Sequence, residues 1–229
     1  MQAKGMGSSG SAIGEEAVGL VPLSYRSHQD ALHSLQAALD TSEGIGLLHG
    51  PEGSGKTTTA RRLEEMMPSD CAIAFIDGTR IKSDEMMTEM LQQFGYDTDL
   101  ETDYELESMI KMFATQQAVS NQAPILVVDN VDRMHSSALR ALNNFAELKI
   151  QDRFAMRVIL TGRDGLDKLV ASEGMPGVKI RIAASYALRP LTIKEALIYL
   201  QARFKASGVI DADAVFPVDV SRRIYEQSG

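Results

Sequence analysis

The 229-residue sequence predicts an α/β fold, in which a five-stranded parallel sheet lies between helices and is followed by a partial helical lid. Two patterns lead to this prediction. Short apolar runs alternate with stretches of helical periodicity, and the last part of the chain has helical stretches without a strand. Consecutive parallel strands need crossover connections, which are usually helices that cover both faces of the sheet.

The expected strands are short runs rich in β-branched and other apolar residues. They are Ile45–His49, Cys71–Ile76, Ile125–Asp129, Met156–Thr161 and Val178–Leu188. The expected helices lie between these runs and have apolar residues at helical spacing. They span about 27–40, 55–67, 83–94, 103–120, 136–148 and 166–172. Strands therefore alternate with helices, as a parallel sheet requires.

Composition divides the chain into three parts. Residues 1–20 are rich in Gly, Ser and Ala and are expected to be a flexible tail or an expression-vector remnant. Residues 21–190 hold the alternating strands and helices. In residues 191–229, Thr192 and Glu195 have the spacing of a capping box, and a second helix is expected near 219–227. We expect this last part to be the start of a helical lid that the chain does not complete.

Charge and cysteine content narrow the class of protein. The chain has 23 Lys and Arg against 31 Asp and Glu, a formal net charge of −8, which argues against a surface devoted to nucleic-acid binding. The single cysteine, Cys71, excludes an internal disulfide, and no Cys/His cluster has zinc-binding spacing. No apolar run approaches the ~20 residues that span a bilayer. We expect a cytoplasmic protein, or the cytoplasmic domain of a longer membrane-associated one.

One motif carries the chemistry. The segment GPEGSGKT, Gly50 to Thr57, matches G-x-x-x-x-G-K-[ST] at every fixed position. Glycines let backbone N–H groups turn toward phosphate oxygens, and the following helix N-terminus adds partial positive charge. The motif predicts the ATP site of a P-loop NTPase, in which Lys56 reaches the β- and γ-phosphates and the Thr57 hydroxyl binds Mg²⁺. The expected ATP-binding residues are consecutive: Gly50, Pro51, Glu52, Gly53, Ser54, Gly55, Lys56, Thr57 and Thr58.

An acid at the end of a neighbouring strand should complete the Mg²⁺ site, and Asp129 ends the run Ile125–Asp129. Many ATPases with this plan place a glutamate directly after that aspartate, where it activates the attacking water. Here the position is Asn130, whose amide can hold a water but cannot accept its proton at neutral pH. Hydrolysis is therefore expected to be slow or absent, unless Asp132 substitutes for the glutamate; the alternative for Asp132 is a solvated acid at a helix start.

With these motifs placed, the chain resembles the AAA+ ATPases, and within them the ATPase domains of the general secretion pathway A type (the ExeA/GspA group), which are related to transposition ATPases. The resemblance covers residues 23–229. It rests on the Walker-A loop at Gly50 to Thr57 and the Walker-B strand Ile125–Asp129, and less specifically on segments 158–163 and 179–191. It implies ATP and Mg²⁺ as cofactors.

The resemblance also implies further site residues. Either Thr161 or Arg163 matches the polar sensor that lies near the γ-phosphate at the end of the fourth strand. Arg181 matches an arginine that reaches a neighbouring subunit's nucleotide and neutralises charge in the transition state; the alternative is a solvated residue at a strand edge. His28 lies in the helix that borders the adenine pocket of such ATPases, with packing or capping as an equal explanation.

Three functions remain as hypotheses. The resemblance favours a Mg²⁺-dependent ATPase that works as a switch or motor on a protein partner in secretion or cell-envelope assembly, as an ATP-dependent homo-oligomer. Asn130 leaves open an ATP-binding module with little or no hydrolysis. A DNA-handling ATPase of the transposition type is disfavoured by the net charge of −8 but is not excluded, because an oligomer can gather a few basic residues.

Overall fold

The computed structural model describes residues 25–41, 44–97, 99–100, 102–150, 152–206 and 218–228. Residues 23–190 form one compact unit, and residues 191–229 belong to another. The expected tail at residues 1–20 lies outside the described residues.

The larger unit contains the predicted five-stranded parallel sheet. Its strands are β1 (Ile45–His49), β2 (Ile73–Asp77), β3 (Ile125–Asp129), β6 (Arg157–Gly162) and β7 (Ile182–Ala187). Their spatial order is β2-β3-β6-β1-β7, and every neighbouring pair is parallel. The predicted α/β fold is therefore confirmed, and the register brings the carboxyl ends of β1, β2, β3 and β6 to one edge of the sheet.

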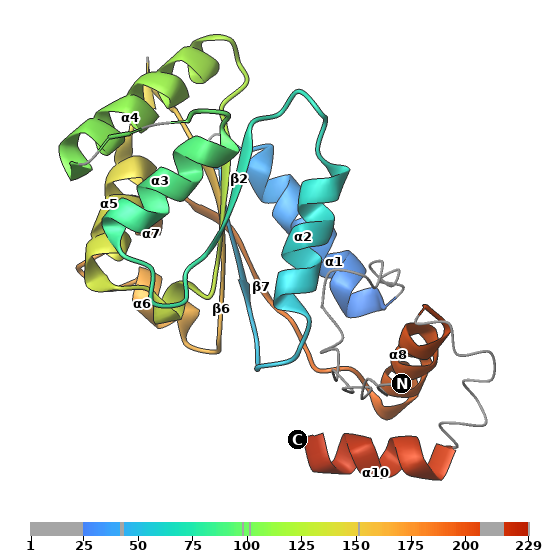
Figure 1. Ribbon diagram of the computed structural model, residues 1–229. Helices are drawn as coiled ribbons and strands as arrows, with labels where there is room; N and C mark the ends of the chain where they lie inside the picture. Colours follow the sequence, from blue (N-terminus) through green and yellow to red (C-terminus); the bar gives the residue numbers. More distant parts are fainter. Residues whose placement is uncertain are drawn as a thin grey trace, which may run out of the picture. The chain divides into compact units, whose positions relative to one another are not determined.

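Helices cover both faces of this sheet (Figure 1). One face carries α1 (Arg26–Leu39) and α2 (Lys56–Met66), which pack on strand residues such as Leu48, Val127 and Ile159. Alternate strand residues, such as Leu47 and Val128, face the other layer. That layer contains α3 (Ser83–Gln93), α4 (Asp103–Val119), α5 (Ser136–Glu147), α6 (Leu166–Val170) and α7 (Pro176–Lys179). The central strands β1, β3 and β6 are thus buried on both faces, which explains why they read as continuous apolar runs. In the edge strand β7, half-buried residues alternate with exposed ones.

Two local differences from the predicted elements have simple causes. The first residues of the expected strand Val178–Leu188 belong to helix α7 instead. Pro176 is the first residue of this helix, a position that suits proline. A short hairpin of β4 (Lys149–Ile150) and β5 (Arg153–Phe154) was not predicted, since strands of two residues are too short to show a periodicity.

The second unit contributes α8 (Ile193–Ala206) and α10 (Val218–Ser228) among the described residues. The predicted capping box precedes α8: Thr192 N donates to Glu195 Oε2 at 2.7 Å, and Glu195 N donates to Thr192 Oγ1 at 3.4 Å. Within the described part of the chain, we find no helix with the length and apolar character that membrane crossing requires.

Candidate functional site

The glycine-rich loop from Gly50 to Gly55, called the phosphate loop for its predicted role, lies between the end of β1 and the start of α2. The backbone N–H groups of the first turn of α2 therefore lie next to it. Its glycines are required by space and by backbone angle. A Cβ on Gly50 would lie 2.4 Å from the carbonyl oxygen of Leu188, and Gly55 has φ of 91° with only 2.8 Å between a built Cβ and His28 Nε2. A side chain at either position would displace neighbouring atoms.

Lys56 is 7% exposed and folds back over this loop. Its Nζ donates to the carbonyl oxygens of Gly50 at 2.9 Å and Pro51 at 2.7 Å. Burial lowers the pKa of Lys56 and outweighs the opposing attraction of Asp129 and nearby acids. The ammonium group therefore lies in a partly desolvated position, where an anionic ligand would stabilise its charge more strongly than in water.

A set of oxygen atoms converges beside the loop. Thr57 Oγ1 donates to Asp129 Oδ2 at 2.5 Å, and Thr161 Oγ1 donates to the other carboxylate oxygen, Oδ1. The backbone N–H of Asn130 also donates to Asp129 Oδ1, at 3.1 Å. Asp129 and Thr161 are buried at the ends of neighbouring strands, so the orientation of this carboxylate is determined by the sheet.

These residues fit a magnesium ion. Mg²⁺ prefers hard oxygen ligands and is usually bound by one or two carboxylates together with substrate phosphates. The Thr57 hydroxyl and the Asp129 carboxylate supply two such oxygens side by side. Among the described residues, no three His, Cys, Asp or Glu side chains group as a metal site.

Residues 39–170 match the protein family described as "AAA domain", which is more than half of the chain. The chain belongs to this AAA family. General secretion pathway protein A of Aeromonas hydrophila is 23% identical to it over 203 residues, which cover 88% of this chain and 37% of that protein. The chain thus spans little more than a third of that relative's length.

Solved structures resemble the AAA chain in fold. Cdc6p from Pyrobaculum aerophilum has a TM-score of 0.63 and 16% identity, over 81% of this chain and 51% of that one. The Aeropyrum pernix ORC2 protein, solved in ADPNP–ADP complexes, has a TM-score of 0.59 and 16% identity, over 81% and 54%. The Drosophila ORC bound to DNA has a TM-score of 0.55 and 17% identity, over 79% and 47%. At these identities the likeness concerns the AAA fold alone.

The AAA domain ties its phosphate loop to α1 through His28. The ring is buried, and its Nε2 lies 3.0 Å from the carbonyl oxygen of Ser54. Because a carbonyl only accepts, this nitrogen must carry a proton. The ring also packs edge-on against Tyr25, with centroids 5.7 Å apart. His28 therefore packs between α1 and the phosphate loop and holds the Ser54 carbonyl in place.

Asn130, the residue in the expected glutamate position, contacts a carboxylate that the sequence did not point to. Its Nδ2 donates to Asp77 Oδ1 at 3.1 Å. Asp77 ends β2 and pairs in register with Asp129 on β3. Burial acts to raise the pKa of Asp77, but hydrogen bonds from Asn130 and Thr79 outweigh it and the net pKa lies below the usual value. The sequence feature that could have pointed to Asp77 is an acid at the end of an apolar run.

Asp132 and Arg163 form a pair with each other. Arg163 Nε donates to Asp132 Oδ2 at 2.6 Å, and Arg163 N donates to Oδ1 at 3.1 Å. These bonds hold the pKa of Asp132 below its usual range against the opposing effect of burial, and they raise that of Arg163. Of the two sensor candidates, Thr161 contacts Asp129, whereas Arg163 is exposed and contacts Asp132.

The position of Arg181 differs from the one expected from the sequence. Arg181 is fully buried, and its Nη1 and Nη2 donate to the carbonyl oxygens of Ala146 and Met156, both at 2.6 Å. Its guanidinium lies 3.9 Å from the Phe154 ring centroid. It precedes β7, at the sheet edge opposite the phosphate loop. The assignment of Arg181 as an arginine that reaches a neighbour's nucleotide is therefore wrong, and so is the alternative of a solvated strand-edge residue, because a buried cation bound to two carbonyls cannot extend outward.

A second cation near the loop was not anticipated. Arg133 follows β3 in the short 3-10 helix η2 (Val131–Arg133), and its Nη2 lies 3.2 Å from Glu52 Oε1. Glu52 is the exposed acid of the phosphate loop. This ion pair connects the loop to the segment after Asp129. It also places a guanidinium beside the site, and the spacing of residues in the sequence gave no sign of this group.

Proposed function

We propose that this AAA domain binds ATP with Mg²⁺ at the loop between β1 and α2 and hydrolyses it slowly, as a nucleotide-dependent switch. The observation that carries the proposal is the contact of Thr57 with Asp129 at the N-terminus of α2. It gives one place where backbone N–H groups, a hydroxyl, a carboxylate and the ammonium of Lys56 meet. That combination suits a triphosphate with its metal ion.

ATP binding would change the hydrogen-bond partners of Lys56. The Lys56 ammonium now donates to two loop carbonyls, and phosphate oxygens would offer it charged acceptors in their place. The Mg²⁺ ion, held by Thr57 and Asp129, would neutralise charge on the phosphates. Thr161, which donates to Asp129, would hold the carboxylate in the orientation that the ion requires.

Hydrolysis needs a group that accepts a proton from water, and Asp77 is the candidate that the geometry favours. Because Asn130 uses its Nδ2 to donate to Asp77, its side-chain oxygen is left to orient a water. Asp77 Oδ1 also accepts from Thr79 N and Oγ1, so the Asp77 oxygen left to take the proton is Oδ2, which accepts no hydrogen bond from the described residues. Asp132 is less suited, since Arg163 occupies both of its oxygens. The low pKa of Asp77 makes it a weak base, which supports a slow rate.

Phosphate release tests this proposal. We expect a measurable rate with ATP and Mg²⁺ that falls to background in Lys56→Ala, and a drop of about 100-fold in Asp77→Asn without loss of nucleotide binding. The matched control is Asp132→Asn, which should retain most of the rate. If wild type releases no more phosphate than Lys56→Ala while binding ATP, the chain is the non-hydrolysing binding module that the asparagine at position 130 also allows.

The proposal also covers the partner of the domain, its pathway and its location in the cell. We infer a protein partner in secretion or cell-envelope assembly and a cytoplasmic position, supported by the 23% identity to General secretion pathway protein A. An ATP-dependent homo-oligomer remains in the proposal on the AAA resemblance alone, because Arg181 no longer argues for it. Light scattering with saturating ATP and Mg²⁺ tests it, and a strictly monomeric chain would remove it.

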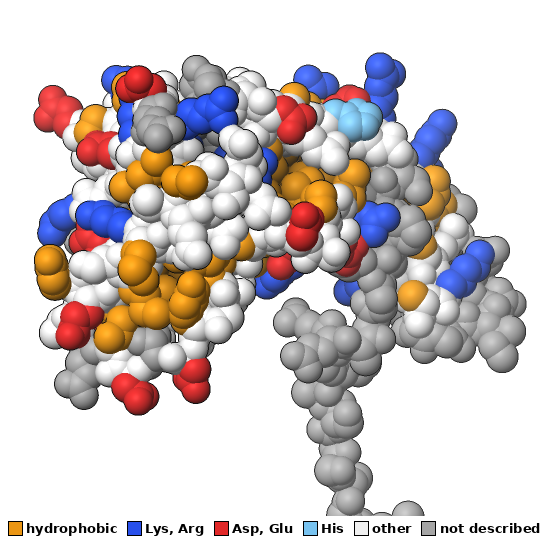
Figure 2. All heavy atoms as spheres, turned by 90° about the horizontal axis from the view of Figure 1, so that it is seen from above, with side chains coloured by type: hydrophobic (Ala, Val, Ile, Leu, Met, Phe, Trp, Pro, Cys, Tyr) orange, Lys and Arg blue, Asp and Glu red, His pale blue; other side chains and the backbone are white. Residues whose placement is uncertain are grey.

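DNA handling is the weaker alternative. Two solved structures of similar fold, the Aeropyrum pernix ORC1 protein and the Drosophila ORC, are described as complexes with DNA, which is the observation in its favour. The net charge of −8 argues against it. Among the coloured side chains of Figure 2, basic and acidic groups are intermingled on the face displayed, without a broad basic surface. Fluorescence anisotropy with a labelled duplex at low salt decides it: absence of binding in the ATP state removes this alternative.

A further inference from the structure

A pocket lies at the edge of the sheet opposite the phosphate loop. The loop follows the carboxyl end of β1, whereas this pocket gathers residues that precede or begin strands: Ala123 before β3, Arg157 at the start of β6 and Arg181 directly before β7. A strand of five residues such as β1 is about 16 Å long, so the two sites are separate. The volume of the pocket is about 760 Å³, within the usual range for small-molecule sites.

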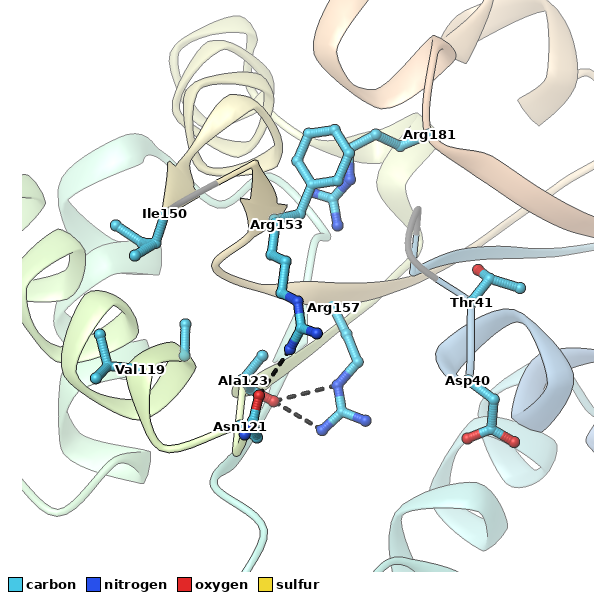
Figure 3. Close-up of a pocket in the computed structure, with 11 residues that line it drawn as sticks. Asp40, Thr41, Val119, Asn121, Ala123, Ile150, Arg153, Arg157 and Arg181 are labelled. Carbon is cyan, nitrogen blue, oxygen red and sulfur yellow. Dashed lines mark hydrogen bonds between the residues drawn. The ribbon is translucent and has the colours of Figure 1, made fainter.

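Two arginines of this pocket bind neutral acceptors side by side (Figure 3). Arg153 Nη1 donates to Asn121 Oδ1 at 2.7 Å. Arg157 donates from Nε and Nη2 to the carbonyl oxygen of Ala123, at 3.2 and 2.7 Å. These contacts hold both guanidinium groups in place, and none of these acceptors carries a charge. A guanidinium has five N–H donors, so each keeps donors for a further acceptor.

Among the residues that the structure describes, the lining of the pocket carries more positive than negative side chains. Its described lining includes Arg153, Arg157 and Arg181 but a single acid, Asp40. Among the described residues, no ion pair joins Arg153 or Arg157 to a carboxylate. In a chain with a net charge of −8, such a local excess of cations is not explained by average composition. The fork of N–H donors on each guanidinium matches the oxygens of a phosphate or carboxylate.

The other wall of the pocket is apolar. Ile150 and Phe154 come from the β4–β5 hairpin, and Val119 comes from the end of α4. Val119 is 67% exposed and so offers its aliphatic surface to a ligand in the pocket. Arg181 packs against the Phe154 ring and so stabilises the hairpin that bears this wall. The ligand should therefore have an apolar part as well as an anionic group.

We propose that this pocket binds an organic phosphate monoester. The doubly charged phosphate contacts Arg153 and Arg157, which together match its charge, and the organic part lies against Ile150 and Val119. A phosphodiester, as in nucleic acid, carries a single charge per group and is less well matched to two adjacent guanidinium groups. The proposal is independent of the nucleotide site, because no lining residue belongs to the phosphate loop.

Phenyl phosphate is a suitable probe, measured by isothermal titration calorimetry on the full chain. We expect a dissociation constant below about 1 mM in wild type and in Lys56→Ala alike. Arg153→Gln and Arg157→Lys should each weaken binding about tenfold, because each removes a charge-assisted bond or its fork geometry. Arg140→Gln, at an exposed arginine of α5 outside the pocket, should leave the affinity unchanged. Asp40→Asn should tighten binding, since it removes a like charge.

The outcomes that overturn the proposal are distinct. Lack of binding at about 10 mM phenyl phosphate excludes the site. Loss of binding in Lys56→Ala places the anion at the phosphate loop instead. Equal affinities for wild type, Arg153→Gln and Arg157→Lys place it elsewhere on the surface. A single-stranded oligonucleotide that binds these arginines, while phenyl phosphate does not compete, would make the pocket a nucleic-acid contact and refute a monoester ligand.

Discussion

Asn130 donates a hydrogen bond of 3.1 Å from its side-chain amide to Asp77 Oδ1, and this bond joins the ends of β3 and β2. Asn130 also has φ of 55° and ψ of 42°, the left-handed region, in which asparagine is better tolerated than glutamate. The residue that replaces the expected glutamate thus suits both its backbone angle and its neighbour. A carboxylate thus lies beside this position, on the adjacent strand.

The first prediction concerns variants that exchange the carboxylate of Asp77 and the amide of Asn130. Asn130→Glu alone should not accelerate phosphate release, because it places a second carboxylate next to Asp77 and costs about 1 kcal/mol for the left-handed backbone. The double variant Asp77→Asn/Asn130→Glu restores one acid and one amide, and it should exceed both single variants in rate. Steady-state phosphate release analysed as a double-mutant cycle measures this coupling. Additive single effects would refute the pairing.

The second prediction concerns the hydroxyl of Thr161, which donates to Asp129. Thr161→Val leaves a buried carboxylate oxygen with one partner fewer, and should lower the free energy of unfolding by about 2 kcal/mol. It should also raise the Mg²⁺ concentration that supports half-maximal phosphate release, because the carboxylate loses its orientation. Thr161→Ser, which keeps the hydroxyl, is the control. Equal Mg²⁺ dependence in the Val and Ser variants would show that the hydroxyl is dispensable.

The third prediction tests His28 as a support of the phosphate loop. His28→Ala removes the donor to the Ser54 carbonyl and leaves a cavity, so we expect a loss of about 2–3 kcal/mol in stability and weaker ATP binding. His28→Gln can still donate to that carbonyl and should recover part of both. Chemical denaturation and nucleotide titration measure the two effects. An adenine contact without a structural role would instead weaken binding of ATP and leave stability unchanged.

The fourth prediction follows from the buried position of Arg181. Arg181→Met leaves the carbonyl oxygens of Ala146 and Met156 without this donor, and should lower stability by about 3 kcal/mol or more. Because the loss is intrinsic, adding wild-type chain should not rescue the variant. An arginine that works across a subunit interface would behave oppositely, with normal stability in urea and recovery of activity in mixed assemblies.

The fifth prediction is a pH dependence. The pKa of Asp132 in the folded chain lies below its ordinary value because of Arg163, so the ionised form favours folding. This contribution is fully present above about pH 4, the pKa expected for an unfolded aspartate, and is lost as pH falls through the lower folded value. The urea midpoints of wild type and Asp132→Asn should therefore differ at neutral pH and converge in acid. High salt should reduce the difference, since the Arg163 side chain of this pair is exposed. A constant difference down to pH 2 would contradict this assignment.

Much of the fold was accessible from the sequence because its determinants are local. The run Ile125–Asp129 reads as a buried strand, and the structure buries all five of its residues. The spacing from Gly50 to Thr57 demands a loop followed by a helix, and α2 begins at Lys56. The hairpin around Arg153 and the short helix α7 that begins at Pro176 had no comparable signal, since each involves only a few residues.

The sequence by itself determined the α/β class, the phosphate loop and the aspartate that lies opposite it, because these depend on periodicity and on residue types at fixed spacing. Tertiary structure alone decided the rest. Asp77 meets Asn130, and Arg181 turns inward, through contacts between residues 53 and 35 positions apart. Which strand end lies beside which is determined by the order β2-β3-β6-β1-β7, and that order follows from packing of the whole sheet.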